Sequence, residues 1–173
     1  MAENRRALEL TDISDVTRAR HLAWLAYNIV LQDKSGPRRA AADAAAAAAA
    51  ATGDLEATIM ADVTLALLDV GEGYRSHALI RLEKLCSLDY TNDAASAHGI
   101  AAMHYAILLA VVGRLDDAAG QVTDGIGRAR REGNAMVLNM WAVISGIVHL
   151  AAGRLSAALD AAEPLPPPQP TGA

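Results

Sequence analysis

The stretch VGRLDDAA at residues 112–119 returns about 40 residues later as AGRLSAAL at residues 152–159. Each copy closes a long apolar stretch, contains a glycine turn and opens another helical stretch. A period of this length, with a helix on each side of a glycine, is typical of stacked helix hairpins. The sequence therefore predicts an all-α fold, a right-handed solenoid of about four antiparallel helix hairpins.

The composition agrees with helices, because the chain is rich in alanine, contains no phenylalanine and has no sustained alternation of apolar and polar residues. We expect the repeat domain to cover residues 1–163. The alanine run within it is expected to be an ordered helix that ends at Gly53. Residues 164–173 are proline-rich, and we expect a tail or linker there. The four predicted pairs join residues 14–32 to the alanine run, 54–70 to 74–88, 93–112 to 114–132, and 134–152 to 153–163.

The charge pattern argues against several classes of protein. The net charge is −5 and the charges are scattered, so no basic face for nucleic acid is expected. Arg128, Arg130 and Arg131 end a predicted helix, where they complement its dipole. Cys86 is the single cysteine, which excludes a disulfide framework. No signal core or membrane-length apolar run is present, and we expect a cytoplasmic protein, from a bacterium by its excess of alanine and arginine.

A second pattern lies around the turn glycines. A small residue stands seven positions before each of these glycines and another stands five positions after it. This arrangement resembles the tetratricopeptide repeat, in which the two small residues mark the close contacts between paired helices. The period is longer than the ~34 residues usual for that repeat, which indicates a divergent form. The three triplets are Ala66, Gly73 and Ala78; Ala106, Gly113 and Ala118; and Gly146, Gly153 and Ala158.

Two longer stretches narrow the resemblance. VGRLDDAAGQVTDGIGRARREGN at residues 112–134 and WAVISGIVHLAAGRLSAALDAAE at residues 141–163 resemble the repeat region of large bacterial LuxR-type, MalT-like transcription regulators. Those proteins join an ATPase and a helix-turn-helix to a repeat-built sensor. The chain has neither a G-x-x-x-x-G-K-[ST] loop nor a basic recognition helix. The resemblance therefore implies a sensor or interaction module of such a regulator, either as a fragment or as a stand-alone relative. The alternative function is a stand-alone repeat adaptor that binds an amphipathic helix or forms a homodimer.

The resemblance also implies a binding groove, because the leading helices of such repeats line the concave side. The corresponding positions here are apolar and include three methionines. They lack the lysine and asparagine that hold a peptide carboxylate. We expect a small apolar effector, an amphipathic helix or a second copy of the chain to bind there; the alternative is that these residues are covered core. The groove residues are Tyr27, Met60, Val63, Leu67, Met103, His104, Ile107, Met140, Val143 and Ile147.

The remaining polar patterns do not support chemistry. His98 and His104 are six positions apart and share no helix face, so we expect no metal site and no cofactor. His104 is instead placed to give a ligand a hydrogen bond. Gly120, Gly125 and Gly127 follow no strand, and they indicate close helix packing rather than a nucleotide loop. With no residues fixed as a catalytic set, we expect a protein that is not an enzyme.

Overall fold

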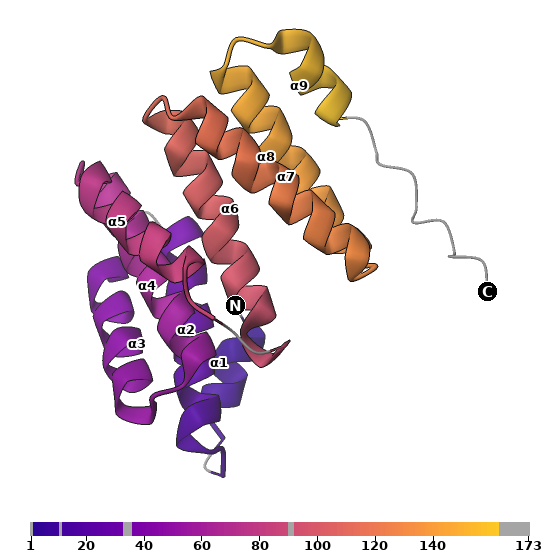
Figure 1. Ribbon diagram of the computed structural model, residues 1–173. Coiled ribbons are helices and arrows are strands. Elements are labelled where there is room, and N and C mark those ends of the chain that lie inside the picture. The colour runs from indigo at the N-terminus through magenta and orange to yellow at the C-terminus, as the bar shows by residue number, and fades with distance from the viewer. Residues whose placement is uncertain (1, 11, 33–35, 90–91, 163–173) are drawn as a thin grey trace, which may run out of the picture. The chain divides into compact units, whose positions relative to one another are not determined.

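The computed structural model describes residues 2–10, 12–32, 36–89 and 92–162, and these residues form α-helices, one 3-10 turn and connecting turns, without strands (Figure 1). The all-α prediction is confirmed. The predicted tail, residues 164–173, lies outside the described residues. Contacts divide the chain into two compact units, Met1–Ala101 and Ala102–Ala173, and the boundary falls within helix α6 (Ala95–Val111).

In the first unit, α2 (Asp15–Gln32), α3 (Arg38–Thr52) and α4 (Leu55–Gly71) pack on one another in all three pairings. Helix α1 (Ala2–Leu8) contacts α2, while α5 (Arg75–Cys86) and the 3-10 turn η1 (Asn92–Ala94) contact α4. The alanine run forms α3, as predicted, and buries Ala42, Ala45 and Ala49. Alanine has the smallest side chain that still favours a helix, and a helix face made of alanines lets neighbouring helix axes approach closely.

In the second unit, α7 (Leu115–Arg131) packs on α8 (Ala135–Ala151), and α8 packs on the short α9 (Leu155–Ala162). Helix α7 buries Ala118, Val122, Gly125 and Ala129, which recur at intervals of four and three residues and so lie on one face. The α7 face is in close contact with α8. A Cβ added at Gly125 would lie 2.1 Å from Cε2 of Trp141, so the indole occupies the space that a side chain would need.

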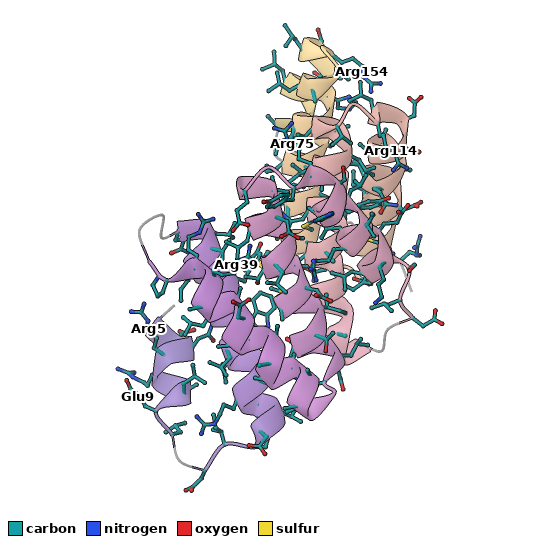
Figure 2. All side chains as sticks on the ribbon, turned by 90° about the vertical axis from the view of Figure 1, so that its left-hand side faces the viewer. Arg5, Glu9, Arg39, Arg75, Arg114 and Arg154 are labelled. Carbon is teal, nitrogen blue, oxygen red and sulfur yellow. The ribbon has the colours of Figure 1, made fainter. Side chains whose placement is uncertain are left out.

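One turn geometry recurs at the repeat interval. Gly73, Gly113 and Gly153 have φ values of 91°, 82° and 72°, in the left-handed region that favours glycine. In each turn the amide of the next residue donates to the carbonyl five positions earlier, as Arg114 does to Leu109 at 2.9 Å and Arg154 to His149 at 2.9 Å (both arginines are labelled in Figure 2). The predicted turns at these three glycines are confirmed. Gly133 has the same geometry between α7 and α8.

The predicted small contact residues are tightly packed. Ala66, Ala78, Ala106 and Ala118 are completely buried. At Gly146 of α8, an added Cβ would lie 3.6 Å from the carbonyl oxygen of Ala158 and 3.9 Å from Cβ of Ala161, both in α9. The contact of Gly146 with Ala158 joins two of the small residues that the sequence pairs in this hairpin.

The contact between Gly125 and Trp141 yields a stability prediction. We expect Gly125→Ala to lower the free energy of unfolding by about 1–3 kcal/mol, because the buried indole must move. Gly120→Ala in the same helix is the matched control, because its added methyl would meet no atom within 4 Å. Since alanine favours a helix interior, we expect the control to gain about 0.5–1 kcal/mol. Urea denaturation followed by circular dichroism measures both, and equal effects would contradict this packing.

Candidate functional site

The ten predicted groove residues do not form one exposed surface. Met60 and Val63 of α4 have no exposed area, and Met103 of α6 is only 5 % exposed. Helix α4 is apolar around most of its circumference, and such a helix is covered on several sides. These three residues are core, which corrects the expectation that they are available to a ligand.

Four further groove residues are partly covered. Leu67 packs against the cluster of Val30, Ala42 and Leu68. Tyr27 lies edge-to-face with Trp24, with ring centroids 6.1 Å apart, and burial raises the pKa of its hydroxyl. His104 and Ile107 of α6 are half-buried. Burial lowers the pKa of His104 to about 4, so its imidazole is neutral at pH 7. The prediction that His104 binds a ligand stays a prediction.

The last three groove residues, Met140, Val143 and Ile147 of α8, are exposed. They belong to a longer row that includes Met136 and Leu150 at the two ends of the helix. At 100° per residue the five side chains cover about 80° of the helix circumference, on the side away from buried Trp141 and Val148.

Helix α9 extends this row. None of its described residues is buried, and Leu155 and Leu159 are 63 % and 72 % exposed. Figure 1 shows α9 turning back beside α8, and their contact runs through Gly146 and Ala158. Helices α8 and α9 run antiparallel and meet at Gly146 and Ala158. In this arrangement the helical register places Leu155 and Leu159 on the same side of the pair as the exposed row of α8. We call this surface the outer face; it consists of Met136, Met140, Val143, Ile147, Leu150, Leu155 and Leu159.

Four of these seven residues were absent from the predicted groove: Met136, Leu150, Leu155 and Leu159. The spacing of Met136 and Leu150 relative to the predicted groove residues could have revealed them. The five residues of the row, from Met136 to Leu150, are separated by four, three, four and three positions, as in the seam of a coiled coil. The repeat register, which counts from the small residues of each hairpin, does not include the ends of the helix.

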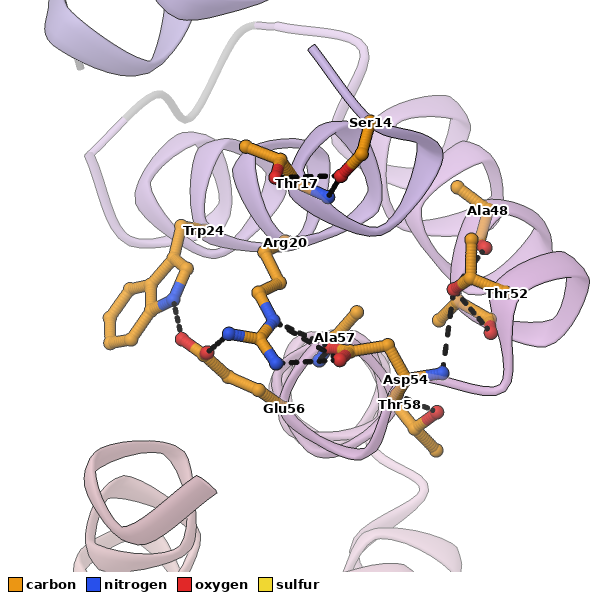
Figure 3. A network of polar contacts seen from close by, with 11 residues as sticks. Ser14, Thr17, Arg20, Trp24, Ala48, Thr52, Asp54, Glu56, Ala57 and Thr58 are labelled. Carbon is orange, nitrogen blue, oxygen red and sulfur yellow. Dashed lines mark hydrogen bonds and ion pairs between the residues drawn. The ribbon is translucent and has the colours of Figure 1, made fainter. Parts of the chain in front are cut away.

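A polar cluster joins α2 to the start of α4 (Figure 3). The guanidinium of Arg20 donates to both oxygens of Asp54, with Nη2 2.7 Å from Oδ2, and its Nη1 lies 3.2 Å from Oε2 of Glu56. The indole Nε1 of Trp24 donates to Oε1 of Glu56 at 2.8 Å. Asp54 is also the N-cap of α4, since its Oδ1 accepts from the Ala57 amide at 2.9 Å.

This cluster links α2 to the start of α4. The Arg20 guanidinium, and next the Ala57 amide, hold the pKa of Asp54 below its ordinary 3.8, against the opposing effect of burial. A second ion pair lies at the other end of α4, where Arg39 of α3 lies 2.7 Å from Glu72 (Arg39 is labelled in Figure 2). The carboxylates of Asp54 and Glu72 are thus each paired with an arginine of a neighbouring helix. These ion pairs account for the two carboxylates as structural contacts between helices.

The described residues contain no group of three or more histidine, cysteine, aspartate and glutamate side chains arranged to hold a metal ion. Within the same residues, no helix has the length and apolar character required to cross a membrane. Of the three predicted packing glycines, Gly125 meets Trp141, whereas an added Cβ at Gly120 would meet nothing within 4 Å.

No protein-family model, curated protein or solved structure matches the chain.

The Asp54 carboxylate, whose side chain is 9 % exposed, yields a prediction. We expect Asp54→Ala to lower the free energy of unfolding by about 1–2 kcal/mol at pH 7, because the helix loses its cap. Asp117→Ala is the control: Asp117 is also in the first turn of a helix, but it is 55 % exposed and pairs with Arg114 three residues away. We expect the control to change stability by less than about 0.5 kcal/mol.

The same pair of variants tests the sign of the pH dependence. Since the pKa of Asp54 is lower in the folded chain than in the unfolded chain, its stabilisation is present above pH 3.8 and is lost as the pH falls through the folded value. The difference between the wild type and Asp54→Ala should therefore shrink below about pH 4. Denaturation curves between pH 3 and 7 measure it, and a difference that grows on acidification would rule out this linkage.

Proposed function

We propose that the chain is a non-enzymatic helical-repeat module that binds an amphipathic helix of a protein partner through its outer face. The observation that carries this proposal is the exposed row from Met136 to Leu150 on α8. Single exposed apolar residues are ordinary on protein surfaces, but a continuous row along a helix is typical of an interaction site.

The shape of the outer face favours a helix over a small apolar effector. A small ligand is bound in a concave site that surrounds most of its surface. The outer face is instead a helix ridge, and its spacing of four and three residues fits the side chains of a second helix with the same spacing. Of the two functions considered from the sequence, the adaptor that binds an amphipathic helix therefore has the stronger support.

The resemblance of residues 112–134 and 141–163 to LuxR-type regulators supports a setting for this module. In that setting, we propose that the repeats carry a signal to or from a regulator by binding a protein partner, and that other parts of the regulator contact DNA. The net charge of −5 fits a module that makes no DNA contact of its own. An ATPase or helix-turn-helix encoded in the same reading frame would support the regulator setting, and a gene that encodes neither would remove it.

The proposed function is tested with a fluorescent three-heptad peptide that carries leucine at the a and d positions. We expect Val143→Asp combined with Ile147→Asp to weaken peptide binding at least tenfold, because two carboxylates would have to be buried in the interface. Ile80→Asp on α5 is the matched control, since Ile80 is 65 % exposed and Val143 is 62 % exposed. Fluorescence anisotropy measures the affinity. The measurement uses protein dilute enough to be monomeric, so that no second copy competes with the peptide for the outer face. Peptide binding that is absent from the monomeric wild type, or that survives the double substitution, would refute the proposed function.

A further inference from the structure

The outer face is larger than a monomer in water usually exposes. Its seven side chains are between 38 % and 72 % exposed. Together they present on the order of 700 Å² of mostly apolar surface, whereas the largest patch on a typical monomer covers about 300–600 Å². A stable protein interface of standard size takes about 800 Å² from each partner. The outer face therefore has about the area that one half of a dimer interface needs.

We propose that a second copy of this chain covers the outer face, with α8 of one copy packed against α8 of the other. This inference rests on the proposed function and names the partner helix. The spacing of Met136, Met140, Val143, Ile147 and Leu150 places alternate residues at the a and d positions of a heptad. Side chains in such a seam insert between those of a helix with the same spacing, and α8 of a second copy supplies that spacing.

The charges around α8 favour a copy of itself over a charged partner. Helix α8 contains no aspartate, glutamate, lysine or arginine between Ala135 and Ala151. Pairing two copies of α8 therefore buries no charged side chain and brings no like charges together along the seam. The charged residues that flank α8 and α9 in the sequence are mixed in sign, with Arg131 and Glu132 before α8, Arg154 before α9 and Asp160 within α9. A strongly basic or acidic partner helix would find no complementary charges on this surface.

The row is also suited to two-fold symmetry. Val143 is its central residue, with Met136 seven positions before it and Leu150 seven positions after it. In a two-fold dimer the same patch serves both copies, so the residue on the axis meets its own counterpart. Val143 is that residue here, and it is small enough for two helices to come close. The flexible methionines on one side of it can adapt to the larger aliphatic residues on the other.

The oligomeric state tests this proposal. We expect sedimentation equilibrium to show a dimer of the full chain, Val143→Asp to be monomeric with unchanged helix content, and Ile80→Asp to remain a dimer. A monomeric wild type across the micromolar range would overturn self-pairing. The peptide experiment would then still decide the proposed function, because a vacant outer face can bind the peptide. A dimer that survives Val143→Asp would place the interface elsewhere and overturn the proposal as well.

A crosslink locates the contact. In a Cys86→Ser background, which removes the native thiol, we expect Val143→Cys to form a disulfide between copies under mild oxidation, because the two residues meet at the axis. Ile80→Cys in the same background is equally exposed and should remain reduced. Equal crosslinking of the two variants would show random collision instead of a defined α8 contact and would overturn the proposal.

Discussion

Close approach of helices at residues with almost no side chain is the constraint on which both units depend. In the first unit the contact is made by alanines such as Ala23 and Ala45, which are completely buried. In the second unit the ring of Trp141 occupies the space that a side chain at Gly125 would need. Where a helix presents only hydrogen or methyl groups, the neighbouring axis comes near, and the larger side chains beside the contact fill the remaining space.

Helix α8 has two apolar sides. One side carries Leu138, Trp141 and Val148, which are buried in the second unit, and the other carries the row centred on Val143. Helix α8 contacts both α7 and α9, yet the row centred on Val143 remains exposed. A continuous exposed apolar row of this kind is typical of an interaction site. The second copy that we propose covers this row.

The sequence predicted the all-α fold class, the glycine turns and the positions of small buried residues because these depend on local chemistry. A glycine at a left-handed position and a small residue at a fixed distance from it can be read from Gly73, Ala66 and Ala78 without knowledge of the neighbours. The alanine run was likewise predicted as a helix from propensity alone. Three of the four predicted helix pairs are in contact, namely α2 with α3, α4 with α5 and α8 with α9. The wider solenoid and the family resemblance remain predictions.

The candidate site was harder to predict because exposure depends on which helix covers which face. Val63 and Val143 occupy the same place in their repeats, three positions before the small residue, yet Val63 has no exposed area and Val143 is 62 % exposed. The difference arises from the neighbours of α4, which pack on it from several sides. The link from Arg20 to Asp54 and Glu56 was also absent from the sequence analysis, because an ion pair between residues 34 positions apart follows from the packing of α2 on α4.

Methyl NMR of the methionines tests most directly whether α8 is covered by a second copy. Met60 and Met103 are buried core, while Met136 and Met140 are 71 % and 41 % exposed, so the described methionines supply both the probe and its internal control. With a soluble paramagnetic agent present, we predict that the Met136 and Met140 signals are strongly broadened in dilute protein and become protected as the concentration rises. The Met60 and Met103 signals should stay protected throughout. Signals of Met136 and Met140 that remain broadened at every concentration would contradict the account.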